Sequence, residues 1–525
     1  MSASKTSPLL ETDSTLPEGW AWIMVSNLGQ RGEVVKTGPF GAILKSKEFV
    51  SVGVPVLAVG NVQSGRLDLK NARLDHVTEK KAAELSAYCV CAGDVLFTRS
   101  GTIGRSAVVP CSAEGWLMSY HILRVRADQQ LVDPRYLYLV FSGCPTSRQY
   151  TNESAIGTTR PGINTQVLES LPIPLPPRIE QERIVTEFER LKSHVNSAND
   201  HLAKVSTTLK AFRQAVLAAA CSGRLTTEWR DSHPQLESAS ALLSRIAGLR
   251  TSKGEHKNKG KNDGDSGLNN FDLPDCPDSW EWATIQQVAE VRGGIQKQPK
   301  RTPRKNSFPY LRVANVLRDK LDLSEIYRME LFEGELETYQ LERGDLLIVE
   351  GNGSLNEIGR SAVWTGAIEH CVHQNHIIRV RACLCSPDYL NIYWNSPVGR
   401  ANVAQVAVTT SGLYSLSTAK VATLPVVIPS LEEQREIVRR VEALFALAVP
   451  IQRHLATATT QAERLTQAIL AKAFKGELVP TEAALARREG RSFESAAALL
   501  ARIRAAGAAS SNNCAPSKQG KRRAK

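Results

Sequence analysis

Two loops carry side chains of the types that hydrogen-bond to nucleic-acid bases. Each loop contains glycine and follows a short β-prone run, at 93–98 in the first half of the chain and at 344–349 in the second. The side chains are Arg99, Ser100, Thr102 and Arg105 in the first half, and Asn352, Ser354, Asn356 and Arg360 in the second. Guanidinium, amide and hydroxyl groups on a loop can enter a groove and contact base edges. A plain hairpin loop that has drifted in sequence is the open alternative.

A second group of residues could neutralise phosphates. Its members are Lys45 and Lys47, which follow a Gly-Pro-Phe-Gly motif at 38–41, Arg160, and Lys297, Lys300, Arg301 and Arg304 within 296–305. The formal net charge of +12 and the pI of about 9.2 also favour a nucleic-acid partner. However, the terminal residues 508–525 hold five of these positive charges and no acid. A tight turn around a buried Phe40 and a solvated basic loop at 296–305 remain open alternatives.

The sequence motifs of common catalytic and metal sites do not occur in the chain. There is no Gly-x-x-x-x-Gly-Lys-Ser/Thr loop, no His-Glu-x-x-His, no Gly-x-Ser-x-Gly turn and no Asn-Pro-Pro-aromatic motif. The ten cysteines lack zinc spacing, so free thiols are the favoured interpretation. We therefore expect a binding protein without its own catalytic residues, cofactor or metal.

These loops must be positioned by larger elements, and the clearest of those is a heptad repeat. Apolar residues alternate at steps of four and three, which is the seam of a coiled-coil helix. They are Ile184, Phe188, Leu191, Val195, Ala198, Leu202, Val205, Leu209, Phe212 and Val216. The same register recurs 253 residues later, at 437–469, after a capping box of Ser430 and Glu433. A helix about 65 Å long cannot bury such a stripe on itself, so we predict that the two helices pair.

The two halves of the chain also repeat each other outside the helices. LPEGWAW from 16 corresponds to CPDSWEW from 276, and HILRVRA from 121 corresponds to HIIRVRA from 376. LPIPLPPRIEQERIV from 171 corresponds to LPVVIPSLEEQREIV from 424. The ordered duplication predicts two domains of one fold, each followed by a long helix.

We predict an α+β fold that is a pseudo-twofold tandem repeat, with two α/β domains and two long helices that pair as an antiparallel intramolecular coiled coil. The segments are a polar extension at 1–15, a first domain at 16–175, a long and a short helix at 176–250, a flexible linker at 251–275, a second domain at 276–428, a long and a short helix at 429–507, and a basic disordered tail at 508–525. The antiparallel arrangement is favoured because each helix then ends near the start of the next domain.

Tandem variable domains that end in LPIPLPP or LPVVIPS, followed by Glu-Gln and by a long helix that stops at a glycine, resemble the specificity subunit of type I restriction-modification systems. The resemblance covers about 16–250 and 276–507. It implies that each domain is a target recognition domain for one half of a split DNA sequence. It also implies that the helices set the spacing of the half-sites and dock the methyltransferase subunits.

The partners implied by the resemblance are double-stranded DNA, two methyltransferase subunits and, in some systems, restriction subunits. S-adenosylmethionine would then belong to the methyltransferase partner, and ATP and Mg to a restriction partner. With no targeting signal and no membrane-spanning run in the sequence, we expect a cytoplasmic location and no membrane contact. A coiled-coil scaffold with two protein- or ligand-binding domains, and a specificity subunit of a methylation-only or type IIB-like system, remain alternatives.

Overall fold

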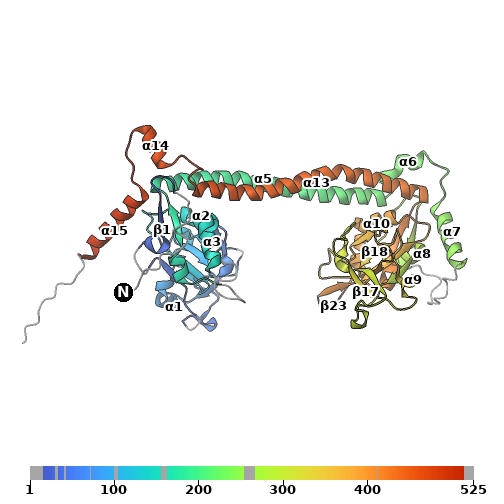
Figure 1. The fold of residues 1–525 in the computed structure, drawn as a ribbon. Coiled ribbons are helices and arrows are strands. Elements are labelled where there is room, and N and C mark those ends of the chain that lie inside the picture. The colour runs from blue at the N-terminus through green and yellow to red at the C-terminus, as the bar shows by residue number, and fades with distance from the viewer. Residues whose placement is uncertain are drawn as a thin grey trace, which may run out of the picture. The chain divides into compact units, whose positions relative to one another are not determined.

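The computed structural model describes residues 16–29, 33–40, 43–70, 72–99, 104–154, 162–252, 267–410 and 412–512. The predicted extension at 1–15, most of the predicted linker, and residues 513–525 of the predicted tail lie outside the described residues. The chain divides into two compact units, residues 1–201 with 457–525 and residues 202–456, and each contains one globular domain (Figure 1). None of the described helices is long and apolar enough to cross a membrane.

The domain of the first unit is built on two small sheets. The central sheet has the order β2-β10-β7-β8 with antiparallel pairing throughout, and the second has the order β6-β3-β9, in which β3 and β9 are parallel. The strands are β1 (Ala21–Met24), β2 (Val35–Thr37), β3 (Val54–Leu57), β4 (Val62–Gln63), β5 (Arg66–Leu67), β6 (Asp75–Val77), β7 (Val95–Thr98), β8 (Ser106–Val108), β9 (Leu117–Met118), β10 (Ile122–Val125) and β11 (Pro172–Leu175). The helices are α1 (Glu79–Glu84), α2 (Pro134–Gly143), α3 (Pro145–Glu153) and α4 (Thr165–Glu169).

Both faces of the central sheet are buried, and alternate residues supply the two faces. Val95 and Phe97 of β7 belong to a core cluster with Tyr136 of α2, whereas Leu96 belongs to a second cluster with Leu57 of β3. This arrangement explains why three consecutive residues of β7, 95–97, are all apolar.

The domain of the second unit repeats this plan, with sheets of order β13-β22-β18-β20 and β17-β14-β21. The strands are β12 (Glu281–Thr284), β13 (Ala289–Gly293), β14 (Ser307–Leu311), β15 (Val316–Leu317), β16 (Lys320–Leu321), β17 (Tyr327–Glu330), β18 (Leu346–Val349), β19 (Gly351–Asn352), β20 (Ser361–Val363), β21 (Val372–His373), β22 (Ile377–Ala382), β23 (Val408–Thr410), β24 (Leu413–Ser415) and β25 (Pro425–Ile428). The helices are α8 (Ile285–Val288), α9 (Glu335–Tyr339), α10 (Pro387–Asn395), α11 (Pro397–Val406) and α12 (Thr418–Thr423). Strands β12-β25 and β15-β16 form two-stranded sheets, and a further sheet, β19-β24-β23, begins in the loop that is longer in this half.

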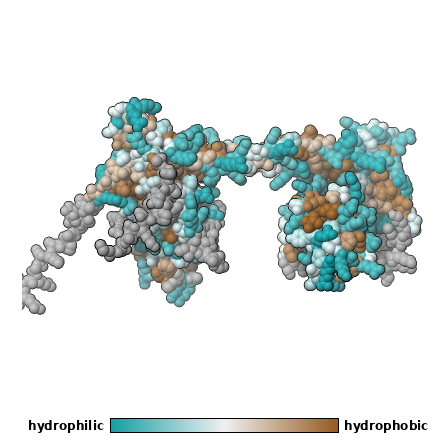
Figure 2. Space-filling model, in the orientation of Figure 1, coloured by the Kyte–Doolittle hydropathy of each residue, from teal (hydrophilic) through white to brown (hydrophobic). Residues whose placement is uncertain are grey.

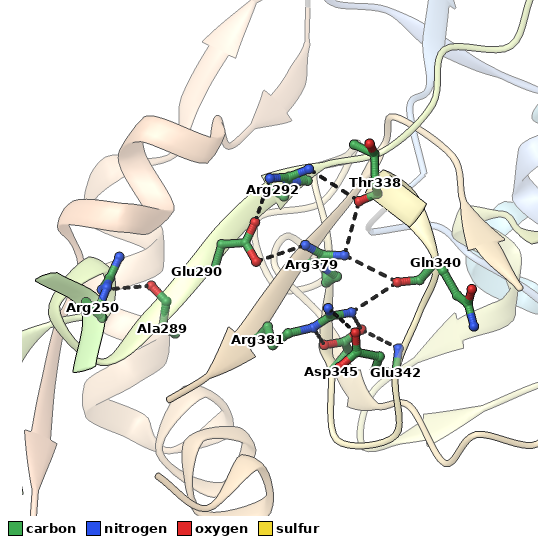
Figure 3. A network of polar contacts seen from close by, with 10 residues as sticks. All are labelled: Arg250, Ala289, Glu290, Arg292, Thr338, Gln340, Glu342, Asp345, Arg379 and Arg381. Atoms are coloured by element: carbon green, nitrogen blue, oxygen red, sulfur yellow. Dashed lines mark hydrogen bonds and ion pairs between the residues drawn. The ribbon is translucent and has the colours of Figure 1, made fainter. Parts of the chain in front are cut away.

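In the second domain, arginines of strand β22 bind the loop at 340–345, which precedes the neighbouring strand β18 (Figure 3). Arg379 of β22 donates to the carbonyl oxygen of Gln340 at 3.3 Å, and Arg381 binds both carboxylate oxygens of Asp345 at 2.7 and 2.8 Å. Arg124 of β10 takes the corresponding buried place in the first domain. Burial lowers the pKa of Arg379 and of Arg124 from the usual arginine value. These buried charges are stable because carbonyls and carboxylates surround them.

Helices α5 (Arg178–Cys221) and α13 (Leu431–Phe474) each have 44 residues, and their antiparallel pairing is confirmed within each unit. In the first unit Phe188 of α5 shares a core with Ile469 of α13. In the second unit Val216 of α5 shares a core with Ile437 of α13. The beginning of each helix therefore packs against the end of the other.

Four residues of the predicted seam are exposed, namely Ala198 and three larger apolar side chains. Val205, Ile451 and Leu465 are 39%, 47% and 51% exposed, and apolar side chains are visible on the surface of the helices (Figure 2). A helix with 3.6 residues per turn drifts by about 20° per heptad from a seam of period 3.5, so a strict heptad prediction loses accuracy along a helix of this length. Helix α13 continues through Pro450.

Shorter helices follow each long helix. Helices α6 (Thr227–Asp231) and α7 (Ala239–Ser252) follow α5, and α14 (Glu482–Glu489) and α15 (Ala496–Asn512) follow α13. Helix α15 extends five residues into the range 508–525 that we assigned to a disordered tail.

A buried Glu-Gln pair in the first turn of each long helix joins the helix to its domain. Glu180 accepts hydrogen bonds from the indole of Trp20 at 2.9 Å and from the amide of Glu482 at 2.8 Å. The next residue, Gln181, accepts from the amide of Asp133 at 2.8 Å and donates to two backbone carbonyls. Burial raises the pKa of Glu180 above its usual value.

The second pair, Glu433 and Gln434, joins the second long helix to its domain, and its glutamate has a charged partner. Glu433 accepts from the indole of Trp280 at 2.8 Å, the hydroxyl of Thr226 at 2.7 Å and the guanidinium of Arg230 at 2.6 Å. Ser430 caps the helix, since its hydroxyl accepts from the amide of Glu433 at 3.2 Å. The capping-box prediction is therefore right for Ser430 and wrong for the Glu433 side chain, which binds tertiary partners instead.

Replacing Glu433 with alanine should destabilise the second unit on the order of 3 kcal/mol, because it leaves a half-buried Arg230 without its anionic partner and a buried Trp280 indole without an acceptor. The adjacent Glu432 is exposed and in the same first turn, so Glu432→Ala should cost less than about 1 kcal/mol. Thermal and urea unfolding of the full chain would measure both. Equal losses for the two variants would contradict the proposed role of Glu433.

Candidate nucleic-acid interface

Four segments meet at one end of the central sheet in the first domain: the Gly-Pro-Phe-Gly motif, the end of β7, the start of β10 and the segment ahead of α4. The amide of Arg99 donates to the carbonyl of His121 at 3.1 Å, and the amide of Ile163 donates to the carbonyl of Arg99 at 3.1 Å. A Cβ atom on Gly38 would lie 2.2 Å from the carbonyl oxygen of Ser119. Only glycine allows the backbones to approach this closely.

A cation and three aromatic rings gather on this scaffold. The guanidinium of Arg99 lies 4.6 Å from the centre of the Tyr120 ring, and Tyr120 contacts the rings of Phe40 at 4.7 Å and His121 at 5.2 Å. Phe40 is 52% exposed, so the alternative of a turn around a buried Phe is wrong. Exposed aromatic faces beside an arginine are suited to contacts with bases.

The second domain has the same backbone arrangement with different side chains. The amide of Glu350 donates to the carbonyl of His376 at 2.9 Å, and the amide of Leu416 donates to the carbonyl of Glu350 at 2.8 Å. Gly294 repeats the close approach of Gly38. The carboxylate of Glu350 then accepts from Nδ1 of His376 at 3.0 Å. A carboxylate thus stands where the first domain has a guanidinium.

Three of the remaining candidates of the first domain lie among the described residues. Lys45, Lys47 and Arg105 are exposed, and the carbonyl of Arg105 accepts from the amide of Thr98 at 2.9 Å, which places it beside Arg99. Ser100, Thr102 and Arg160 lie outside the described residues.

In the longer loop of the second domain, several predicted residues also have structural contacts. The Asn352 side chain accepts from the amide of Ser354 at 3.0 Å. The carbonyl of Asn356 accepts from Arg318 at 2.7 Å, and Arg360 donates to the carbonyl of Val313 at 2.9 Å. The loop is therefore ordered by its own polar groups, with the side chains of Ser354 and Asn356 exposed.

The basic segment 296–305 is divided between structural and exposed cations. Arg301 binds both carboxylate oxygens of Glu335 at 2.7 and 2.8 Å, and this contact lowers the pKa of Glu335. Glu330 accepts from the backbone amides of residues 304–306, which lowers its pKa as well. Lys297, Lys300, Arg304 and Lys305 are exposed, so they are the members of this segment with charge on the surface.

Sequence analysis missed two features of the site. The sequence pattern favours the amides and hydroxyls that follow Glu350, although the position of Glu350 one residue after the strand matches that of Arg99. The stacking of Phe40, Tyr120 and Arg99 joins residues about 80 positions apart and leaves no local pattern. In the described residues, no cluster of three or more His, Cys, Asp or Glu could hold a metal ion.

Comparison with known proteins agrees with the duplicated architecture. The family described as "Type I restriction modification DNA specificity domain" matches residues 24–206 and 277–457. The type I restriction enzyme EcoKI specificity subunit of Escherichia coli (strain K12) is 29% identical over 518 residues, which cover 96% of this chain and 99% of that protein. The StySPI specificity subunit of Salmonella potsdam is 28% identical over 502 residues, 93% and 96% of the two chains. A solved chain from work on complex assembly of the type I R-M system covers 88% of this chain and 99% of its own length, with a TM-score of 0.60 at 18% identity, and so supports the fold.

In the second domain, His373 should make the stability of the fold depend on pH. Its ring is fully buried, Nδ1 donates to the carbonyl of Ile377 at 3.0 Å, and burial together with the nearby Arg379 lowers its pKa to about 4. Because the unfolded chain takes up a proton near pH 6.5 and the folded chain does not, this stability is present above pH 6.5 and is lost as the pH falls towards 4.

Between pH 7 and pH 5 the loss from His373 should be about 2 kcal/mol. Asparagine can keep the donor to the carbonyl but does not titrate, so the His373→Asn variant should lose less stability than the wild type over the same interval. Urea unfolding at the two pH values would measure the difference. The same pH dependence in both proteins would contradict the assignment.

Proposed function

The chain belongs to the family of type I restriction modification DNA specificity domains, and from this premise we propose that each of its two domains reads one half of a bipartite DNA target. The observation that carries the proposal is the pair of matched surfaces described above. Their backbone hydrogen bonds are the same, while the side chains at the matched positions differ in charge and shape. Two readers of different half-sites would differ in this way, because direct readout depends on side-chain donors and acceptors.

The long helices are proposed to set the gap between the half-sites. Each has 44 residues without interruption, and the buried Glu-Gln pairs join each helix to its domain. A helix that is rigidly joined to a domain transmits a change in its length as a change in the domain's position. The chain would thus set the distance between the two half-sites as well as recognise their sequences.

The chemical steps are proposed to belong to partner chains. Methylation would use S-adenosylmethionine bound by the methyltransferase subunits, and cleavage, in a system that has restriction subunits, would use ATP and Mg. This chain would be the non-catalytic subunit of a cytoplasmic complex.

Two matched grooves support docking of two copies of one partner. In the first unit, Gln467 of α13 and Arg148 of α3 line a groove of about 560 Å³. In the second unit, Gln214 of α5 and Arg400 of α11 line a groove of about 350 Å³. Each residue occupies the same position of the repeat as its counterpart, so both grooves offer an amide from a long helix and a guanidinium from a helix of the domain. We propose that each groove receives one methyltransferase subunit.

Inserting one heptad into each long helix should widen the gap in the recognised DNA by about three base pairs, since seven residues add about 10 Å and a base pair about 3.4 Å. The insertion would duplicate 198–204 in α5 and 451–457 in α13, positions that correspond in the repeat. The variant would be co-expressed with its methyltransferase subunit in a host without DNA methylation, and modified bases would be mapped.

Both half-sites should be unchanged in the insertion variant. A Lys204→Ala variant, which alters the same stretch of helix without changing its length, serves as the control and should keep the wild-type gap. An unchanged gap in the insertion variant would contradict the measuring role. Absence of any split motif from a folded, assembled wild-type complex would contradict the proposed function itself.

Replacing Arg148 with glutamate should remove one methyltransferase subunit from the complex, because the groove of the first unit loses its cation. Native mass spectrometry with excess methyltransferase subunit would show one copy bound instead of two. Arg73→Glu is the control, since Arg73 is an exposed arginine in the same domain outside the groove, and it should keep two copies. Two bound copies on the Arg148 variant would show that the groove is not the docking site.

A further inference from the structure

The end of one strand carries opposite charges in the two domains. Arg99 directly follows β7 and Glu350 directly follows β18. The amide and the carbonyl of each residue make the same two backbone hydrogen bonds, to His121 and Ile163 in the first domain and to His376 and Leu416 in the second. The two positions are therefore equivalent, and only the side chain distinguishes them.

Arg99 offers hydrogen-bond donors in a fixed plane. Its guanidinium rests on the Tyr120 ring, 4.6 Å from the ring centre, and Nη1 contacts the hydroxyl of Thr37 at 3.4 Å. In the described part of the chain its other nitrogens have no hydrogen-bond partner, so they can face a ligand. A planar pair of donors matches the O6 and N7 acceptors of guanine in the major groove.

Glu350 offers only acceptors. One carboxylate oxygen accepts from His376, which orients the group, and the other has no partner among the described residues. Next to a phosphate backbone a carboxylate is repelled unless it meets a donor. The major groove presents amino donors on cytosine and adenine, and adenine places its N7 acceptor beside the amino group. Cytosine therefore fits a single free carboxylate oxygen better than the other bases.

We propose that Arg99 and Glu350 are corresponding base-reading residues, Arg99 for a guanine in one half-site and Glu350 for the N4 amino group of a cytosine in the other. His376 is the positioning residue for Glu350, and Tyr120 is that for Arg99. This inference rests on the proposed function and adds to it the residue and the base at one position of each half-site.

The test is methylation mapping and binding selection from random DNA with the assembled complex, for the wild type and for Arg99→Gln and Glu350→Gln. Arg99→Gln should lower the preference for guanine at one position of one half-site by roughly 10- to 100-fold. Glu350→Gln should lower the preference for cytosine by a similar factor at one position of the other half-site and move it towards adenine, which an amide can bind through N6 and N7.

Two controls separate base reading from general binding. Glu357 is an exposed acid in the same loop as Glu350, and Glu357→Gln should leave the motif unchanged. Arg105→Gln removes a cation near Arg99 and should weaken binding to all sequences equally, with a smaller dependence on salt. Circular dichroism and retained methyltransferase binding would establish that each variant is folded.

The outcomes are distinguishable. A wild-type motif that is split, together with single-position changes in the two variants, supports the inference. A split wild-type motif that neither variant alters, or that changes in both half-sites at once, overturns the inference and leaves the proposed function standing. A folded wild-type complex without a split motif overturns the proposed function.

Discussion

The structure depends on a buried carboxylate in the first turn of each long helix. Glu180 and Glu433 are almost completely buried, and each is bound to the indole of the tryptophan that opens its domain. A buried acid without donors would be costly, so the tryptophan, the backbone amide of Glu482 and the Arg230 guanidinium must all be in place. The contact ties a domain's start, its end and a short helix that follows the opposite long helix into one rigid joint.

That joint explains how the two halves of the chain can keep the same fold while their surface loops differ in sequence. The glutamine beside each glutamate binds backbone groups of the domain, and the buried arginines of the central sheets hold the loops below them. These contacts lie in the interior of each domain and do not involve the side chains at the ends of β7 and β18. Those side chains can therefore differ between the two domains. As a result, Arg99 and Glu350 can have opposite charges on the same backbone without a change in fold.

Part of the site follows from residue types and part does not. The sequence predicts that the loop with Arg99 and the basic segment with Lys297 and Arg304 present polar groups on the surface, because these residues follow strands or lie among polar neighbours. It does not predict that Arg301 is neutralised by Glu335, that Phe40 is exposed on Tyr120, or that Glu350 is held by His376. These contacts join residues 26 to 80 positions apart, and no local periodicity encodes them.

The sequence by itself determined the duplication, the two long helices and the Ser430 cap, because heptads and helix caps are local patterns, and the heptads and domains repeat at a nearly fixed offset. The order of the segments favoured antiparallel pairing, and the packing within each unit confirmed it. Only the tertiary structure decided which seam positions are covered and which partner the carboxylate of Glu433 binds. It also decided which side chains meet at the ends of β7 and β18. The physical reason is that a helix is specified by neighbours three and four residues away, whereas burial, ion pairing and stacking depend on groups that the fold brings together from distant positions.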